Sequence, residues 1–329
     1  MIEKQAVGMG RIAAPLRTAL VQREFALLGV LVIFGIIMTA ASPVFLTRGN
    51  IEALLLGLSV EGTIAVGMVM VMIIGGFDLS VGSTLAFTGV VTGLALTAGI
   101  PTPISVAIGL LAALGVGLSN GLLVAKLKIN AFIATLGMML TVRGLLLVLA
   151  EGKTVLNLPR DFTVIGQGTL VGIQYPIYIM LLVVIVGDLL MRNSKFFRQN
   201  YYVGGNERAA RLSGMNVDRV KIVNFCIVAL LAGLAGLMIT ARFGAASVTV
   251  GNGIELRVIT AAIIGGASLN GGEGSVLGAF LGALFMGVLA NALNLLGVDV
   301  YWQNLVTGLI LIIAVVIDVL NERRKSGQK

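Results

Sequence analysis

A run of 47 residues, 79–125, contains no Asp, Glu, Lys or Arg. Water-soluble domains carry about one charged residue in four, so an uncharged run of this length indicates a bilayer environment. A helix that crosses a bilayer needs about 20 apolar residues, which makes the run too long for one span. Pro101 and Pro103 interrupt it, because proline ends or kinks a helix. The run therefore predicts two membrane-spanning helices, over 79–97 and 103–125.

The composition of the whole chain supports a membrane protein. Of the 329 residues, 57% are hydrophobic and 12% are charged, and the mean hydropathy is +1.03. Such a chain cannot cover a globule with polar surface, which excludes a soluble enzyme or a nucleic-acid-binding domain despite the net charge of +8. The chain has no histidine, and its one cysteine, Cys226, lies in an apolar run. We therefore expect no catalytic residues, no disulfide and no imidazole metal site.

The other apolar runs extend this interpretation to an all-α integral membrane protein, a polytopic helical bundle of about ten transmembrane helices. We expect one transmembrane domain over 25–321, preceded by a segment over 1–24 and followed by a tail over 322–329. The eighth span is the shortest of the set. The ten expected spans are 25–46, 54–74, 79–97, 103–125, 130–150, 174–191, 220–241, 255–268, 274–293 and 301–320.

The positions of the basic residues predict the orientation of the bundle. If the N-terminus is cytoplasmic, the internal segments hold 17 of the 23 Lys and Arg, and 6 lie elsewhere. Lys and Arg concentrate in cytoplasmic loops, so this distribution predicts that both termini are cytoplasmic. It also makes 151–173 a large external loop and 192–219 a large internal loop.

Two glycine clusters follow apolar segments, at 75–82 and at 265–278. Each glycine in a helix interior costs about 1 kcal/mol relative to alanine, so neither cluster favours a continuous helix. Broken or short helices in corresponding halves of a chain are typical of the substrate path of a transporter. The alternative is a pair of tight turns between helices.

The ionisable residues within the expected spans are few: Glu61, Asp78, Arg143 and Asp188. Arg143 and Asp188 lie near span ends, where they can reach the interface, and the Asp78 carboxylate can cap the following helix. Most other polar residues are neutral, which suits an uncharged, hydroxyl-rich solute and argues against proton coupling. Alternatively, each polar side chain forms a hydrogen bond between helices. The candidate path residues are Glu61, Asp78, Ser80, Asn120, Thr135, Ser268, Asn270, Asn291 and Asn294.

The internal loop 192–219 contains a predicted short helix over 206–212. Asn206 is a suitable N-cap, Glu207 falls in the first turn, and Gly214 can end the helix. One interpretation is a basic loop held at the membrane surface; the other is a helix that docks into a partner protein. A nucleotide site is not expected, because Gly152-Lys153-Thr154 lacks the earlier glycine of a P-loop and has Leu147 there.

At these motifs the chain resembles the ribose-type permease family of bacterial ABC importers, over roughly 25–318. The resemblance rests on Gly-Gly-Phe-Asp-Leu-Ser-Val-Gly (75–82), Gly-Gly-Asn-Glu-Arg-Ala-Ala-Arg-Leu-Ser-Gly (204–214) and Gly-Gly-Ala-Ser-Leu-Asn-Gly-Gly-Glu-Gly-Ser (265–275). It implies a multi-pass protein of the bacterial inner membrane, embedded in lipid, that pairs with a second permease copy or a paralogue. It further implies an ABC ATPase with two nucleotide-binding domains, which binds ATP and Mg²⁺, and a periplasmic sugar-binding protein.

The resemblance also implies a role for the loop between the sixth and seventh expected spans. Carried over by motif, the segment 204–214 is the cytoplasmic segment that contacts the ATPase. Its residues are Gly204, Gly205, Asn206, Glu207, Arg208, Ala209, Ala210, Arg211, Leu212, Ser213 and Gly214.

Three functions remain open at this point. The leading hypothesis is a permease subunit that imports a monosaccharide or related polyol, driven by ATP hydrolysis on another chain. The second is an ion- or proton-coupled secondary transporter that uses the same broken helices for a small neutral solute. The third is a membrane scaffold without transport, which would show neither solute flux nor a co-purifying ATPase.

The orientation is testable with a reporter enzyme that is active only in the periplasm. Fused after Lys329, the reporter should be inactive, because the basic residues place this end in the cytoplasm. A fusion within 151–173 serves as the active control. Activity of the Lys329 fusion would refute this topology.

Overall fold

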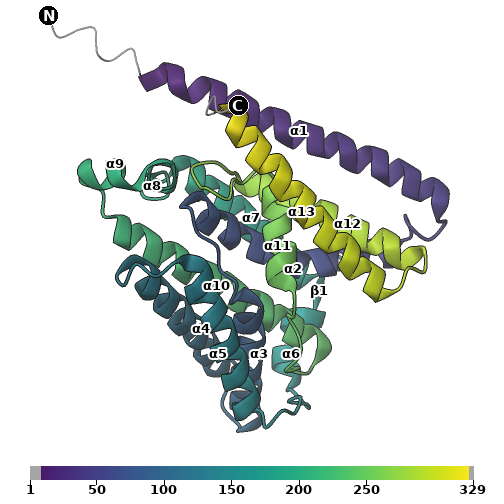
Figure 1. Ribbon diagram of the computed structural model, residues 1–329. Helices are drawn as coiled ribbons and strands as arrows, with labels where there is room; N and C mark the ends of the chain where they lie inside the picture. Colours follow the sequence, from purple (N-terminus) through teal and green to yellow (C-terminus); the bar gives the residue numbers. More distant parts are fainter. Residues whose placement is uncertain (1–8, 326–329) are drawn as a thin grey trace, which may run out of the picture.

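The computed structural model describes residues 9–325, and most of this part of the chain is helical (Figure 1). Two strands of two residues each form the only sheet in the described part. In chain order the elements are α1 (Met9–Ala41), α2 (Arg48–Ile73), α3 (Val81–Thr97), α4 (Thr102–Ala125), α5 (Ala131–Leu149), α6 (Arg160–Gln167), β1 (Thr169–Leu170), β2 (Ile173–Gln174), α7 (Tyr175–Asn193), α8 (Gln199–Gly205), α9 (Glu207–Leu212), α10 (Val217–Phe243), α11 (Ile254–Ile264), α12 (Val276–Leu295) and α13 (Val300–Lys325).

Eight of the described helices are long and apolar enough to cross a membrane, which confirms an all-helical membrane architecture. Each of the ten stretches expected from the sequence contains a helix. Two are shorter than a full span: α3 has 17 residues and α11 has 11. The count of ten crossings therefore stays a prediction. The eight candidate spans are Glu24–Ala41, Arg48–Ile73, Thr102–Ala125, Ala131–Leu149, Tyr175–Asn193, Val217–Phe243, Val276–Leu295 and Val300–Leu320.

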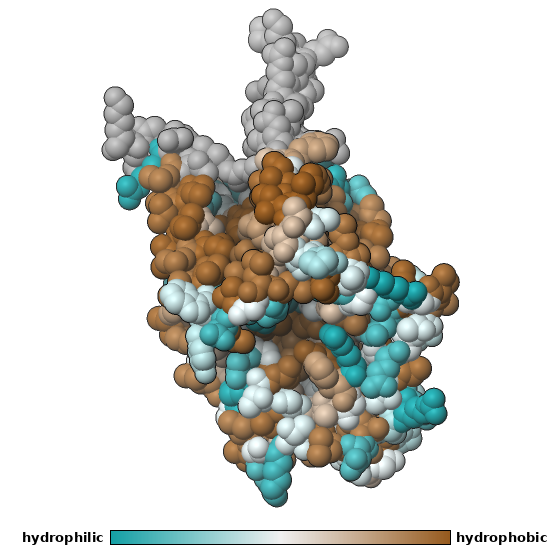
Figure 2. Space-filling model, turned by 90° about the vertical axis from the view of Figure 1, so that its right-hand side faces the viewer, coloured by the Kyte–Doolittle hydropathy of each residue, from teal (hydrophilic) through white to brown (hydrophobic). Residues whose placement is uncertain are grey.

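Helices α2 and α10 form the centre of the bundle. The spanning window of α2 is 78% buried and that of α10 is 56% buried, against 6% for α1 and for α13. Figure 1 shows α3, α4 and α5 gathered beside α10, while α1, α12 and α13 lie together on the opposite side. Many large apolar side chains remain exposed on the outer helices, as lipid-facing surfaces require. Figure 2 shows these apolar side chains over the upper part of one face and hydrophilic ones across its middle and lower part.

The chain between α10 and α11 is irregular, although it lies between two apolar helices. Gly244, Gly251 and Gly253 there have positive φ angles of 64°, 82° and 76°. Arg143 of α5 donates hydrogen bonds from its Nη1 to the carbonyl oxygens of Val248 and Val250, at 2.8 and 3.1 Å. The guanidinium is thus turned into the bundle, which corrects the expectation that it reaches the interface. Within a membrane such bonds are needed, because lipid cannot satisfy free carbonyl groups.

The large loop expected over 151–173 carries structure of its own. Helix α6 buries Phe162 completely, against Leu96, Leu237 and Ala241. Strands β1 and β2 then form an antiparallel hairpin, with Thr169 opposite Gln174 and Leu170 opposite Ile173. This end of the molecule lies away from α8 and α9 (Figure 1).

Candidate functional site

Three glycine-rich segments that are far apart in the sequence meet at one end of the bundle, around the carbonyl group of Ile73. The Ile73 carbonyl accepts a hydrogen bond from the amide of Gly272, at 2.8 Å. A Cβ atom at Gly204 would overlap the same carbonyl oxygen, and one at Gly271 would lie 2.8 Å from the amide nitrogen of Gly75. The end of α2, the end of α8 and the 265–275 loop are therefore packed backbone to backbone.

Helix α8 is fixed to the bundle by two further contacts. Asn200 and Asn224 of α10 are both fully buried and exchange amide hydrogen bonds of 2.9 and 3.0 Å. The Tyr201 hydroxyl donates to the carbonyl oxygen of Gly274, at 3.0 Å. Buried amide pairs are costly to separate, because each loses its partner in a low-dielectric interior. Helix α8 is thus tied to both α10 and the 265–275 loop.

Helix α9 follows at once and is present where the sequence predicts it. The Asn206 side chain accepts a hydrogen bond from the amide of Ala209, which caps the helix, and Gly214 ends it with a φ of +81°. Ala210 is buried against the bundle, whereas Leu212 is 83% exposed. Arg208 and Ala209 are also exposed. A helix with one face packed on the bundle and one exposed face can bind another protein and transmit its displacement to the bundle.

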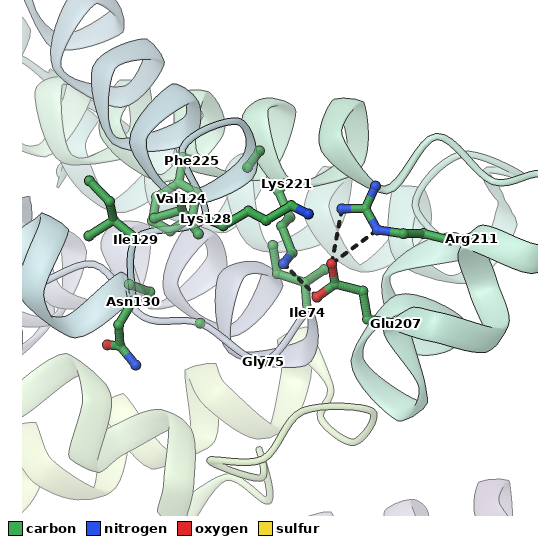
Figure 3. A pocket seen from close by; sticks show the side chains of 13 residues that line it. Ile74, Gly75, Val124, Lys128, Ile129, Asn130, Glu207, Arg211, Lys221 and Phe225 are labelled. Carbon is green, nitrogen blue, oxygen red and sulfur yellow. Dashed lines mark hydrogen bonds and ion pairs between the residues drawn. The ribbon is translucent and has the colours of Figure 1, made fainter.

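Five charged side chains hold α9 against α10 and the end of α4. Arg211 pairs with Glu207 at 3.0 Å and with Asp218 at 2.7 Å. Lys221 pairs with the second carboxylate oxygen of Glu207 at 2.7 Å, and Lys126 pairs with Asp218 at 3.1 Å. Figure 3 shows Glu207 reaching between Arg211 and Lys221. Networks of this kind stabilise more than isolated surface pairs, which contribute about 0–1 kcal/mol each.

The charge network shifts the titration of Glu207 and borders a cavity. Burial alone would raise the pKa of Glu207, but hydrogen bonds and charges from Lys221 and Arg211 outweigh it and lower the pKa below its usual value. The cavity has a volume of about 340 Å³ and lies between α9, α10, the α4–α5 turn and the first glycine cluster (Figure 3). It is lined by Ile74, Gly75, Gly76, Val124, Ala125, Lys128, Ile129, Asn130, Ala131, Glu207, Arg211, Lys221 and Phe225.

Three of the predicted path residues, Asp78, Ser80 and Asn120, lie together and are fully buried. The Asp78 carboxylate accepts hydrogen bonds from the Ser80 amide at 2.8 Å and hydroxyl at 2.6 Å. The Asn120 amide donates to Asp78 at 3.1 Å and to the Ser80 hydroxyl at 2.9 Å. The carboxylate therefore closes the turn before α3 and ties it to α4. It does not cap the first turn of α3 as expected; Ser80 occupies the N-cap position.

A second group centres on Glu61 of α2, which forms an ion pair of 2.9 Å with Arg257 of α11. The Arg257 side chain is only partly buried, with 42% of its surface exposed. Glu255, two residues earlier, lies in the first turn of α11. These charges face one another across segments that are about 200 residues apart in the sequence.

The remaining predicted path residues do not join either group. Thr135 is buried and donates back to the carbonyl of Ala131 on its own helix, at 2.8 Å. The Asn270 amide donates to the Ser268 hydroxyl at 3.3 Å, in a loop that also contacts Asp318 of α13. Asn291 exchanges amide hydrogen bonds with Asn50, at 2.7 and 3.0 Å. Asn294 accepts from Gln303, at 2.8 Å.

The sequence interpretation did not single out Glu255 or Arg257, and it treated Arg143 as a span-end residue. The sequence interpretation assigned 255–268 to an eighth span and did not ask why this span has two charged residues at its start. Arg257 fell among the six basic residues outside the cytoplasmic segments, and only its contact with Glu61 shows that it lies inside the bundle. Among the described residues, no cluster of three His, Cys, Asp or Glu side chains is arranged to hold a metal ion.

Comparison with known proteins identifies the family of this chain. The family model described as "Branched-chain amino acid transport system / permease component" matches residues 50–315. The chain belongs to this permease family. No solved structure matches the chain.

Curated relatives confirm the resemblance to ribose-type permeases. The ribose import permease protein of Escherichia coli strain K12 is 39% identical over 304 residues, which cover 91% of this chain and 94% of the relative. The L-arabinose ABC transporter permease protein of Azospirillum brasilense is 38% identical over 304 residues, covering 92% and 90%. The ribose import permease protein of Bacillus subtilis strain 168 is 38% identical over 299 residues, covering 90% and 92%.

Gly204→Ala should detach α8 and α9 from the bundle, because the new Cβ atom would overlap the Ile73 carbonyl. Overpacking of this kind costs about 1–3 kcal/mol, so we expect the melting temperature of the purified permease to fall by several degrees. Gly205→Ala is the matched control, because a Cβ atom there has open space. Equal melting temperatures for the two variants would contradict the packing described.

Glu207→Gln should show a defined dependence on pH. Because the pKa of Glu207 is lowered in the folded protein, its contribution to stability is complete above the ordinary carboxyl range, about pH 4.3. That contribution is lost as the pH falls through the lowered value. The difference in melting temperature between wild type and Glu207→Gln should therefore be constant at neutral pH and close only below about pH 4. A difference that widens on acidification would refute the ion-pair network.

Proposed function

We propose that this chain is the membrane-spanning permease subunit of an ATP-binding-cassette importer that translocates a monosaccharide or related polyol. The observation that carries the proposal is α9: one side of this helix is anchored to three glycine segments and an ion-pair network, and the other side is exposed. The relatives' names, ribose and L-arabinose permeases, support a monosaccharide as the solute.

The partners follow from this assignment. An ATPase with two nucleotide-binding domains would bind ATP and Mg²⁺ and dock on the exposed side of α9, whereas this chain itself would hydrolyse nothing. A periplasmic sugar-binding protein would deliver the solute at the opposite end, where α6 and the β1–β2 hairpin lie. A second permease copy or a paralogue would complete the membrane assembly, and the outer helices would face the lipid of the bacterial inner membrane.

The orientation and the number of crossings form part of the proposal. We place the end that carries α9 in the cytoplasm, together with both termini, because the basic residues concentrate there. With α3 and α11 counted beside the eight long helices, the chain would cross the membrane ten times. The two short helices are then the broken elements that transporter paths commonly contain.

An ion- or proton-coupled secondary transporter is the alternative. It requires ionisable groups inside the bundle that change partner during transport. In the described residues, Glu61 is paired with Arg257, and Asp78 is held by Ser80 and Asn120. These pairings and the exposed α9 favour a transporter driven by another chain.

The double substitution Glu207→Ala with Arg211→Ala tests the proposal. It removes the ion pairs that seat α9, so ATP-driven uptake of labelled ribose or arabinose into vesicles should fall to background. Membrane insertion should be unaffected, because α9 lies outside the candidate spans.

A control variant separates coupling from general damage. Asp188→Ala with Arg192→Ala removes an i,i+4 ion pair of 2.7 Å at the same end of the bundle, on α7. We expect it to retain uptake. Unchanged uptake in the Glu207 and Arg211 variant would refute the coupling role, and uptake that survives ATPase deletion but collapses with a protonophore would favour the secondary transporter.

A further inference from the structure

The ion pair between Glu61 and Arg257 lies at mid-depth in the bundle. Glu61 is 13 residues after the start of α2 and 12 before its end, and α2 is long enough to span a bilayer. Arg257 is 2.9 Å from it and therefore lies at the same depth. Arg257 reaches this depth because α11 begins inside the bundle, after the irregular segment that follows α10.

The surroundings of the pair cannot be hydrocarbon. On insertion scales a charged side chain at the bilayer centre costs about 2.5–3.5 kcal/mol, and such residues face the bundle interior or water. Yet 42% of the Arg257 side-chain surface and 19% of the Glu61 side-chain surface are uncovered by this chain. Leu256, which points about 100° away from Arg257 around α11, is 47% exposed, so the uncovered surface extends partly around the helix. This side of α11 therefore faces either water or another polar surface within the assembled importer.

Hydrogen-bonding capacity is left over on that open side. Among the described residues, the Nε atom of Arg257 is buried without a hydrogen-bond partner, although it lies 2.9 Å from a Glu61 carboxylate oxygen, and no hydrogen bond of the chain uses the Nη groups or the second Glu61 oxygen. A pair that served only to hold α2 against α11 would be expected to use these groups internally, as buried polar groups normally do. Arg143 provides the contrast, because its Nη1 is fully engaged by two carbonyl oxygens.

Two helix N-termini also converge near this level. The first turns of α3 and α11 meet where Gly82 and Gly251 pack backbone to backbone, and a Cβ atom at Gly82 would overlap the Gly251 carbonyl. The Glu255 carboxylate is close by, 2.6 Å from the same Cβ position. Glu61, Arg257, Glu255 and Arg143 contribute two negative and two positive charges. The group is thus formally neutral while it offers both donors and acceptors.

We propose that Arg257 and Glu61 line the translocation path and bind the hydroxyl groups of a neutral sugar as it passes mid-membrane. A guanidinium fork donates to vicinal hydroxyl oxygens and the carboxylate accepts from hydroxyl groups, so the pair matches a polyol and gives no advantage to an ion. This inference rests on the proposed sugar import and adds the residues that contact the solute. Glu61 is already among the path residues expected from the sequence, and its ion pair with Arg257 adds a cation to that mostly neutral lining.

Water access to the pair is the first test, and it does not depend on transport. In a Cys226→Ala background, Arg257→Cys and Leu256→Cys are each treated with a membrane-impermeant methanethiosulfonate in the assembled importer. The Leu256 variant keeps the ion pair and covers the case in which the arginine variant fails to fold. Leu182→Cys, 62% exposed and mid-helix on α7, is the control. Labelling at 256 or 257 at least about tenfold faster than at 182 is expected; equal, slow labelling would overturn the proposal.

Solute contact is the second test, made by ATP-driven uptake of labelled ribose and arabinose. Arg257→Gln should lower uptake about tenfold or more, in keeping with the loss of hydrogen bonds to a charged group. The exchange of Glu61→Arg with Arg257→Glu restores an ion pair but moves the guanidinium to α2. Uptake that stays low in the exchanged variant supports solute contact; full recovery, or full uptake by Arg257→Gln, would overturn it. Lack of ATP-driven uptake by the wild type would instead refute the proposed function, and the labelling result would be unaffected.

Discussion

The close approach of three backbone segments at the Ile73 carbonyl is the contact on which the rest of the structure depends. Only segments without side chains can meet there, because Gly204 and Gly271 leave no room for a Cβ atom. At this contact α2 ends, α8 packs against the bundle, and the 265–275 loop is held by hydrogen bonds to both helices. Since α2 is the most buried of the eight candidate spans and α8 leads directly into α9, a displacement at the surface of α9 reaches the centre of the membrane domain through few contacts.

The bilayer explains why many buried polar groups of this chain are paired with one another or with the backbone. Lipid offers no hydrogen bonds, so interruptions in the helices must be satisfied by the protein or by water. Arg143 satisfies two carbonyl groups of the segment between α10 and α11, and Asp78 satisfies the turn before α3. Glu61 and Arg257 differ from these groups, because part of their surface and hydrogen-bonding capacity remains free. That difference separates residues that hold the bundle together from residues available to a solute.

The sequence predicted the local features well and the long-range contacts poorly. Apolar runs located a helix in each of the ten expected stretches but missed the short helices α6 and α8, whereas the Asn206 cap and Gly214 end of α9 follow from residue chemistry within a few positions. Prolines and glycines likewise marked the positions where helices end, because their effect on the backbone is local. The meeting of Gly204 with Ile73, or of Arg257 with Glu61, depends on how helices pack across about 130 to 200 residues of sequence. Nothing in a hydropathy pattern specifies that packing, so Arg143 was expected at the interface and Glu255 was overlooked.

The central claim is that α9 is the surface on which a separate ATPase acts. The most direct measurement is site-specific photo-cross-linking in the intact importer, with a benzophenone attached to a single cysteine in a Cys226→Ala background. Leu212→Cys on α9 and Val171→Cys on the β1–β2 hairpin are 83% and 91% exposed and lie at opposite ends of the bundle. The account predicts a cross-link to the ATPase from position 212 and none from position 171. Capture of the ATPase from position 171 but not from 212 would contradict it.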